Sequence, residues 1–315
     1  SEQAASVLDV LRMELTFRHV SVVTECELRN ILEKKNGFLL ETDKGRFSGK
    51  KIIFATGLLA APKTGRDGSA IPLIKAFGHR FSDVVPALVA LQCRESFFKQ
   101  LAGIRTEAEV SLFIDGESIA SERGELQLTD YGISGIPIFQ VSRFAAVELQ
   151  KKRKPYLVLD SMPDYSKEWI VKQIVRRAEW NPKQSFGDLI EGLLPDKLGL
   201  VFLQQCHIDP ASKAEQCLPK KIQQLVQKIK HNVLTIKEVS GFEKAQVTAG
   251  GLATGQVDPD TMESKLCKGL YFTGELLDID GICGGYNLQW AWTSGYLAGK
   301  ACGMRHKERK EDKKA

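Results

Sequence analysis

A glycine-rich loop that leads into a helical pattern is the segment of this sequence best suited to chemistry. Residues 278–289 read DIDGICGGYNLQ, and the helix is expected to begin just after Gly284 and Gly285. A helix start offers unpaired N–H groups and about half a positive charge. Amides that face the N1 and C2 carbonyl edge of a flavin would stabilise the negative charge that develops on reduction. The loop therefore predicts a redox-cofactor site.

Two short apolar runs end in small-residue turns, Ala55-Thr56-Gly57 and Thr273-Gly274-Glu275, and more than two hundred residues separate them. In an open α/β sheet, ligands lie beyond the carboxyl ends of the strands, where glycine lets the backbone approach phosphate or ribose. The Glu275 carboxylate can accept hydrogen bonds from two hydroxyl groups. Each turn, taken alone, is equally typical of a tight turn after a buried strand.

The elements that must position these turns follow from residue periodicity. Ala5–Leu15 has helical spacing, and Lys51–Gly57 is expected to contain a strand buried on both faces. A hairpin turn is expected at Lys35-Asn36-Gly37, within a small antiparallel layer. The strands expected in this layer are Val20–Thr24, Cys26–Glu33 and Phe38–Thr42.

The middle of the chain changes pattern twice. Short strands such as Glu107–Ile114 and Gly124–Thr129, joined by a turn at Asp115-Gly116, predict a small barrel or sandwich. Residues 164–232 then show helical spacing, with prolines between the segments. The chain returns to a strand at Gly269–Glu275 and a helix at Tyr286–Cys302. Ala291, Gly295 and Gly299 lie four apart on that helix and predict close packing against a sheet.

Composition excludes several classes of protein. With 315 residues and 43% apolar content the chain is typical of a globular protein. Its seven cysteines include no CxxC pair, so we expect free thiols and no metal site. The longest apolar stretch, Val84–Cys93, is about half the ~20 residues that cross a bilayer, and no secretion signal is visible. We expect a cytoplasmic protein with no membrane partner.

The net charge of +5 gives no reason to expect a nucleic-acid partner. Residues 305–314 carry six Lys or Arg against three acidic residues, which leaves +2 for the remainder. A nucleic-acid surface would need basic residues clustered on one face with aromatic residues among them. The basic tail is expected to be disordered and solvated.

Longer strings of residues resemble one known family. In order, they are Gln3–Leu11 (QAASVLDVL), Ala55–Gly57, Gly78-His79, Pro86–Val89, Asp130–Gly135, Val247–Gly251, Thr261–Lys265 and Gly269–Gln289. Together they resemble the aminoacetone-oxidase-type bacterial FAD-binding oxidoreductases, a family that also includes bile-acid-intermediate reductases. The resemblance extends from about residue 3 to residue 303.

The resemblance implies an α/β fold in which a discontinuous Rossmann-like FAD domain carries an inserted β-barrel-like domain and an inserted helical domain. The implied FAD domain comprises residues 1–86 and 257–303, and the barrel residues 87–163 with 233–256. The helical insert is residues 164–232, and 304–315 is the tail. The implied activity is an FAD-dependent oxidoreductase that transfers hydride between reduced nicotinamide, NAD(P)H, or oxygen and a small organic substrate.

The resemblance also assigns the cofactor-binding residues. Ala55, Thr56 and Gly57 would lie near the adenosine and pyrophosphate of FAD, and Glu275 near the ribityl chain. Leu28 would contact adenine through its backbone. Gly285, Tyr286, Asn287 and Leu288 would lie at the pyrimidine edge of the flavin, and Gly274, Asp280 and Gly284 are also expected to bind the cofactor.

Two departures from the family pattern matter. The family usually continues Ala-Thr-Gly with a second glycine, whereas this sequence has Leu58. It also lacks the GxGxxG turn of a first βαβ unit, which is ~30 residues or more and normally binds the pyrophosphate. That unit could precede these residues in a longer protein or belong to a separate chain. The alternative is a non-catalytic remnant that cannot hold FAD alone.

No catalytic residue is assigned, because flavin chemistry needs the protein chiefly to bind and orient the cofactor. His79 is interpreted as structural, although it could donate a proton to a substrate. Cys283 is interpreted as a small loop residue, although its place beside the expected flavin would suit redox chemistry. Tyr131 and Tyr286 are interpreted as packing residues, although either could donate a proton or cover the ring. The segregated sequence of the helical insert leaves open a role in docking a partner.

Overall fold

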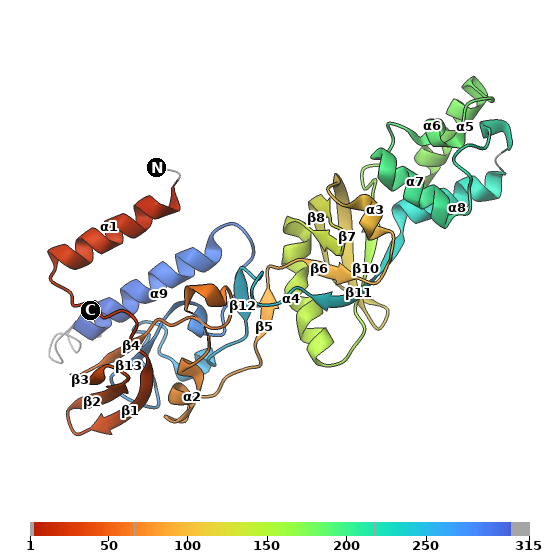
Figure 1. Ribbon diagram of the computed structural model, residues 1–315. Helices are drawn as coiled ribbons and strands as arrows, with labels where there is room; N and C mark the ends of the chain where they lie inside the picture. Colours follow the sequence, from red (N-terminus) through yellow and green to blue (C-terminus); the bar gives the residue numbers. More distant parts are fainter. Residues whose placement is uncertain (1–2, 66, 217, 304–315) are drawn as a thin grey trace, which may run out of the picture.

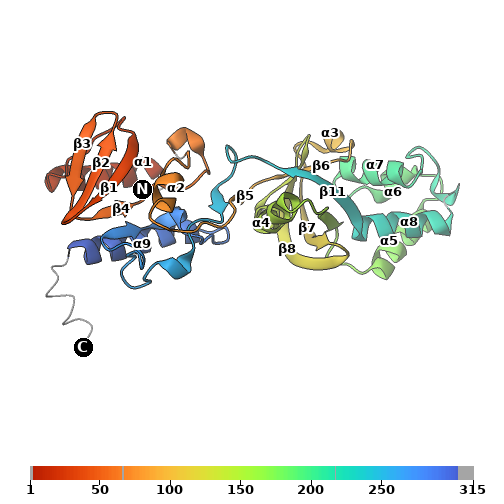
Figure 2. The ribbon, with the colours of Figure 1, turned by 90° about the horizontal axis from the view of Figure 1, so that it is seen from below.

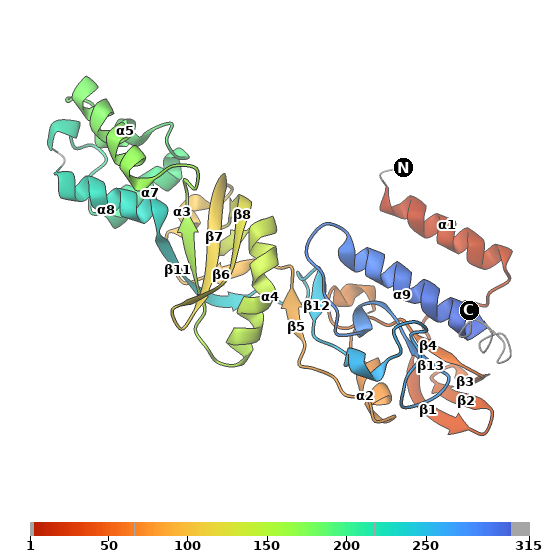
Figure 3. The ribbon, with the colours of Figure 1, turned by 180° about the vertical axis from the view of Figure 1, so that it is seen from behind.

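The computed structural model describes residues 3–65, 67–216 and 218–303. Its parts lie in a row: both ends of the chain at one end, a barrel in the middle and a helical insert at the far end (Figure 1). Views from below and behind show the same order (Figures 2 and 3). We call residues 3–84 and 250–303, without 66, the terminal region. The expected disordered tail and Cys217 lie outside the described residues.

Two small sheets form the terminal region. One is antiparallel in the order β1-β2-β3, and the other is a parallel pair of β4 and β13. The predicted hairpin is confirmed, because Lys34 pairs with Gly37 across Lys35 and Asn36. The strands are β1 (Leu28–Lys34), β2 (Gly37–Thr42), β3 (Gly45–Gly49), β4 (Ile52–Phe54) and β13 (Leu270–Phe272).

One long helix packs against the parallel pair. The long α9 packs against it through Ser294, Ala298 and Ala301, while Phe54 and Phe272 stack at 5.6 Å between ring centroids. The helices of this region are α1 (Ala4–Phe17), α2 (Ala70–Lys75) and α9 (Tyr286–Gly303), with 3₁₀ turns η1 (Pro62–Thr64), η3 (Thr254–Gln256) and η4 (Gly274–Leu276).

The central barrel confirms the predicted β-rich middle of the chain. Six strands close in the order β10-β11-β6-β9-β8-β7. The burial pattern along β7 alternates, as expected where one face of a strand points into a packed interior. The elements are β6 (Leu91–Cys93), α3 (Phe98–Leu101), β7 (Arg105–Ile114), β8 (Glu117–Leu128), β9 (Gly132–Ser134), α4 (Ile136–Gln150), β10 (Tyr156–Asp160) and β11 (Asn232–Val239).

Two connections join the barrel to the terminal region, and they pair with each other as β5 (Val85–Ala87) and β12 (Val247–Ala249). At the other end, the predicted helices share one apolar core with the barrel. Serine side chains cap two of them, because Ser166 Oγ accepts from the Trp169 amide and Ser185 Oγ from the Asp188 amide. The insert comprises α5 (Lys167–Trp180), α6 (Phe186–Ile190), α7 (Asp196–Gln205), η2 (Ala214–Gln216) and α8 (Pro219–Lys230).

Three expectations for the terminal region are wrong. Val20–Thr24 forms no strand and is exposed, because no described strand pairs with it. Ile53 in β4 is exposed rather than buried, since β13 is its only partner among the described strands. Gly295 and Gly299 do not press against a sheet: within the described residues, an added Cβ at either would meet nothing within 4 Å.

No helix within the described part of the chain is long and apolar enough to cross a membrane.

Candidate functional site

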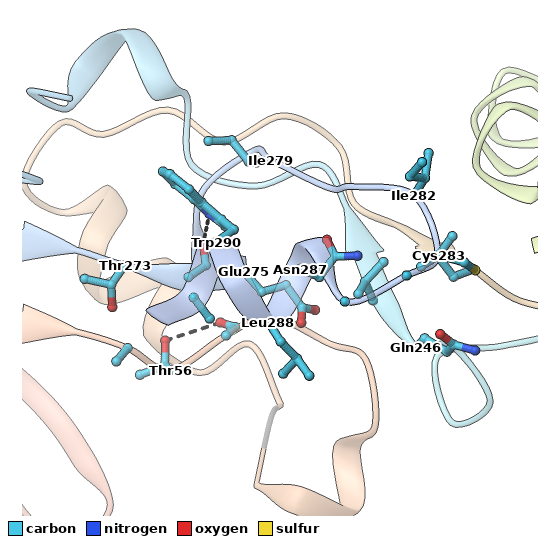
Figure 4. Close-up of a pocket in the computed structure, with 18 residues that line it drawn as sticks. Thr56, Gln246, Thr273, Glu275, Ile279, Ile282, Cys283, Asn287, Leu288 and Trp290 are labelled. Atoms are coloured by element: carbon cyan, nitrogen blue, oxygen red, sulfur yellow. Dashed lines mark hydrogen bonds between the residues drawn. The ribbon is translucent and has the colours of Figure 1, made fainter. Parts of the chain in front are cut away.

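A cavity of about 470 Å³ opens where β4 and β13 end (Figure 4). The two strands run parallel, so their carboxyl ends meet at one edge of the sheet and bring the turns after them together. Ala55, Thr56 and Gly57 line the cavity from one turn, and Gly274 and Glu275 from the other. Segments more than two hundred residues apart thus form one site.

Hydrogen bonds fix the turn after β13. The Gly274 amide donates to Ser294 Oγ at 2.9 Å, and the Trp290 indole Nε1 donates to the Gly274 carbonyl at 3.1 Å. Gly274 has a φ of 65°, in the left-handed region that favours glycine. The Glu275 Oε1 accepts from the Thr248 amide at 3.0 Å, which ties this turn to β12.

The glycine-rich loop forms the opposite wall and leads into α9. Gly284 and Gly285 have φ values of 121° and 90°, so both need the conformational freedom of glycine. Asn287 holds the loop through two bonds: Gly281 N donates to its Oδ1 at 2.8 Å, and its Nδ2 donates to Gly281 O at 2.9 Å. The first backbone N–H groups of α9 have no hydrogen-bond acceptor within the helix, because no helical carbonyl precedes them by one turn.

Helix α4 of the barrel braces the same loop from outside. Cys283 N donates to Gln140 Oε1 at 3.1 Å, and Arg143 Nη1 lies 3.0 Å from Asp280 Oδ2. The Asp280 side chain is only 6% exposed, whereas that of Arg143 is 41% exposed. Burial raises the pKa of Asp280, and the Arg143 charge opposes that rise. Contacts between α4 and the terminal region therefore hold the loop in place.

Comparison with known proteins identifies the fold family. Residues 1–301 match the family model described as the HI0933-like protein Rossmann domain. The chain belongs to the HI0933-like family. The predicted family and the α/β fold with a Rossmann-like domain are thereby confirmed.

Three curated relatives resemble this HI0933-like chain over most of its length. It is 41% identical to the 3-dehydro-bile acid delta(4,6)-reductase of Clostridium scindens over 97% of this chain and 75% of the relative. It is 28% identical to the ribosomal RNA dihydrouridine synthase of Haemophilus influenzae, over 94% and 72%. The Escherichia coli synthase of the same name is 26% identical, over 94% and 71%. These names place the chain among redox enzymes.

Most of the residues predicted to bind the cofactor of this HI0933-like protein line one cavity. They are Ala55, Thr56, Gly57, Gly274, Glu275, Gly284, Gly285, Asn287 and Leu288. Three others are not among its lining residues: Leu28 lies in β1, Asp280 faces Arg143, and Tyr286 is exposed. The backbone amide of Tyr286 still belongs to the start of α9.

Nine lining residues were not predicted. They are Leu88, Gln246, Val247, Thr273, Ile279, Ile282, Cys283, Trp290 and Ala291. Thr273, Ile279, Ile282 and Cys283 adjoin predicted residues in the sequence, so a wider window would have included them. Leu88, Gln246 and Val247 belong to the two connections to the barrel, and only the tertiary fold brings these to the cavity.

The side chains weighed for proton transfer lie in different surroundings. His79 is buried, hydrogen-bonded to Ser264 Oγ at 2.9 Å through Nε2, and burial lowers its pKa. Tyr131 lies away from the cavity, with Lys244 Nζ 5.0 Å from its ring centroid. Cys283 does line the cavity, but burial raises its thiol pKa. It is therefore protonated rather than a reactive thiolate.

Proposed function

We propose that this chain forms most of an FAD-dependent reductase that adds hydrogen across a C=C bond conjugated to a carbonyl group. The observation that carries the proposal is the cavity at the ends of β4 and β13, which the α9 start and Glu275 both line. Left-handed glycines on both walls leave room for a cofactor to approach the backbone. The residues present therefore fit a flavin dinucleotide.

The names of the relatives support this reaction class. A delta(4,6)-reductase of a 3-dehydro-bile acid and a synthase of dihydrouridine both saturate a C=C bond conjugated to a carbonyl group. FAD, when bound, supplies a hydride obtained from NAD(P)H to the carbon β to the carbonyl. A proton added at the α carbon completes the reduction. These names indicate two candidate substrate classes, a small steroid-like acid and a uracil base.

The residues of this chain would bind and orient the flavin. The amides of Tyr286, Asn287 and Leu288 would hold negative charge at the pyrimidine edge of the ring. The Glu275 carboxylate, fixed by Thr248, would accept from ribityl hydroxyls. Ala55, Thr56 and Gly57 would lie along the adenosine and pyrophosphate. The ion pair between Arg143 of α4 and Asp280 would keep the glycine-rich loop in position beside the flavin ring.

A second part of the proposal concerns the bare outer surface of the terminal region. No residue of α1 is buried by the described part of the chain, although the helix is rich in apolar side chains. Helix α9 exposes Leu288, Trp292 and Tyr296 along one stripe, and Figures 1 and 2 show α1 separated from α9. Strand β4 exposes Ile53 beside its free edge.

A βαβ unit with a GxGxxG turn would cover this surface. Parallel sheets are normally covered on both faces, and a strand added beside β4 would place the glycine turn at the edge where the cavity opens. The exposed Gly295 and Gly299 would let its helix approach α9 closely. The relatives contain additional length outside the matched region. We propose that such a unit, in the same chain or a separate one, completes the cofactor site.

Flavin absorbance tests both parts of the proposal. The described chain would be purified alone and together with a βαβ unit from a relative, each with added FAD. We expect yellow protein only when the unit is present. Colourless protein in both cases would contradict the cofactor assignment and favour the non-catalytic remnant. Yellow protein from the chain alone would contradict the need for the unit. A flavin-loaded protein should then oxidise NAD(P)H in the presence of an enone.

A further inference from the structure

Most polar side chains that line the cavity are already hydrogen-bonded to the protein. The Thr56 and Thr273 hydroxyls donate to backbone carbonyls at 3.3 and 3.2 Å. The Asn287 amide and the Trp290 indole hold glycines of the loop and of the turn after β13. Glu275 Oε1 accepts from a backbone amide. These side chains fix the shape of the cavity, which limits what they can offer to a substrate.

The Gln246 side chain is an exception among the polar groups of the cavity. It is exposed and lines the cavity, and the structure records no hydrogen bond for it within the described residues. A neutral amide side chain offers two N–H donors and a carbonyl acceptor. Because no partner holds it, Gln246 can turn either group toward a ligand.

The backbone beside Gln246 is fixed to the cofactor side of the cavity. Val247 pairs with Ala87 across β12 and β5. The Thr248 amide donates to Glu275 Oε1 at 3.0 Å, which joins this strand to the turn after β13. The start of β12 therefore holds the Gln246 backbone in place, while its side chain stays free to rotate.

Gln246 lies at the barrel end of the cavity. Figure 4 shows it near Cys283, on the side of the cavity away from Thr56. Leu88 and Val247 also line the cavity, and they belong to the apolar cluster on which Cys283 packs. A hydrogen bond in such apolar surroundings is electrostatically stronger than in water. A few polar groups in an apolar wall are also what fixes the orientation of a ligand.

We propose that Gln246 binds the carbonyl oxygen of the substrate and stabilises the enolate that forms during reduction. The inference rests on the proposed function, which assigns the turns after β4 and β13 to the cofactor and leaves the barrel end for the substrate. Hydride from reduced FAD brings two electrons to the β carbon, and the C=C π pair moves through the α carbon onto the carbonyl oxygen. Gln246 Nε2 donates to that oxygen as its charge develops. A proton from water at the α carbon then restores the carbonyl group, and Gln246 keeps both of its protons.

Cys283, at the same end of the cavity, fits this role less well. A thiol is a weak hydrogen-bond donor, and this side chain packs on the apolar cluster. Its backbone amide is already bonded to Gln140 Oε1 at 3.1 Å. Cys283 therefore serves the wall of the cavity, and the free amide donors belong to Gln246.

Steady-state reduction of an enone by flavin-loaded protein that contains the βαβ unit tests this role. Gln246→Met keeps the length of the side chain and removes the donors. We expect kcat to fall about tenfold with little change in KM, because the bond strengthens only as charge develops on the oxygen. A preorganised donor would contribute more, whereas Gln246 must first lose its rotational freedom. Gln246→Glu, whose carboxylate would repel an oxyanion, should lower kcat further.

Binding of 4-nitrophenolate to the same protein provides a readout that needs no turnover. This planar anion carries its charge on an oxygen, as an enolate does, and its own absorbance reports binding. We expect Gln246→Met to weaken this binding about tenfold, the effect of losing a hydrogen bond to a charged group. The affinity for FAD should stay within about twofold of wild type, as for most surface changes. Unchanged unfolding midpoints would show that the variant folds.

Lys244→Met is the matched control, because it places the same side chain at an exposed position of the same connection. Lys244 Nζ lies 5.0 Å from the centroid of the Tyr131 ring, and Lys244 does not line the cavity. Both kcat and the phenolate affinity should stay within about twofold of wild type. Equal losses in Lys244→Met and Gln246→Met would show a general effect of the connection and overturn the proposal.

The outcomes separate this inference from the proposed function. Unchanged kcat and phenolate affinity in flavin-loaded Gln246→Met would refute the role of Gln246 alone. Loss of FAD from that variant would mean that Gln246 supports the cofactor, and would also overturn the inference. A wild-type protein that holds FAD but reduces no enone would refute the proposed reaction, and the phenolate affinities would still decide whether Gln246 binds an oxyanion. A protein that holds no FAD even with the βαβ unit would refute both.

Discussion

The barrel with its helical insert and the terminal region differ in how completely they bury their apolar residues. The barrel and insert share one continuous core that includes the fully buried Phe186 and Phe202. In the terminal region, α1 leaves even Phe17 77% exposed. The contrast shows that a segment can form a helix without burying its apolar side chains. An amphipathic sequence forms a helix in both regions, but only one region contains the surface that the helix needs.

The largest expected effect tests this contrast with the same substitution in both regions. Phe186→Ala should lower the free energy of unfolding by about 3–5 kcal/mol, because it leaves a cavity in a packed core. Phe17→Ala should change it by no more than about 0.5 kcal/mol, as for other exposed positions. Urea denaturation of the two variants provides the measurement. Similar losses in both would mean that α1 packs against something within the chain.

Amide hydrogen exchange should reveal the same contrast without mutation. A 14-residue helix without tertiary packing is marginally stable, so the α1 amides should exchange rapidly while those of α8 are protected. Addition of the proposed βαβ unit should slow exchange in α1 about a hundredfold, equivalent to ~2.7 kcal/mol. The α8 amides serve as the internal control. Unaltered α1 exchange in the extended protein would argue that the unit docks elsewhere.

The brace between α4 and the glycine-rich loop should respond to pH. Arg143→Met leaves Asp280 without its partner and should cost about 1–2 kcal/mol at pH 7, less than a fully buried pair because Arg143 is partly exposed. Burial already raises the pKa of Asp280 in the folded state. Its charged form therefore destabilises the fold at neutral pH, and this cost disappears as the pH falls below the unfolded pKa.

Chemical denaturation at several pH values checks this sign. The difference between wild type and Arg143→Met should shrink toward pH 4, where a protonated Asp280 needs no cation. Arg153→Met is the matched control, because Arg153 is 53% exposed in its pairs with Glu148 and Asp115. Glu148 also keeps Lys151 at 2.8 Å, and pairs that involve exposed groups contribute little. A pH-independent difference would show that Arg143 acts through packing alone.

The smallest expected effect concerns a helix cap in the well-packed region. Ser166→Ala removes the hydroxyl that accepts from the Trp169 amide at 3.1 Å and should cost about 1 kcal/mol. Gln3 is the N-cap of α1 and makes no side-chain hydrogen bond to the helix, so Gln3→Ala should leave stability unchanged. Thermal unfolding compares the two substitutions. A loss from Gln3→Ala as large as that from Ser166→Ala would break the contrast between the regions.

Local pattern was enough to predict most elements and the two turns of the site. The Lys35–Asn36 turn, the alternation along β7 and the helical spacing of the insert each depend on residues close in sequence, and the structure contains all of them. Val20–Thr24 shows where this reasoning fails. Its apolar residues have strand character, but a strand requires a neighbour to accept its hydrogen bonds, and the described chain supplies none there.

The sequence by itself determined the glycine positions, the turns after β4 and β13 and the family to which the chain belongs, because backbone freedom and residue order are local properties. Only the tertiary structure decided that Asp280 would face Arg143 instead of the cavity, and that Leu88 and Val247 of the connections would line it. Which side chains meet depends on contacts between distant segments, and no local pattern specifies those.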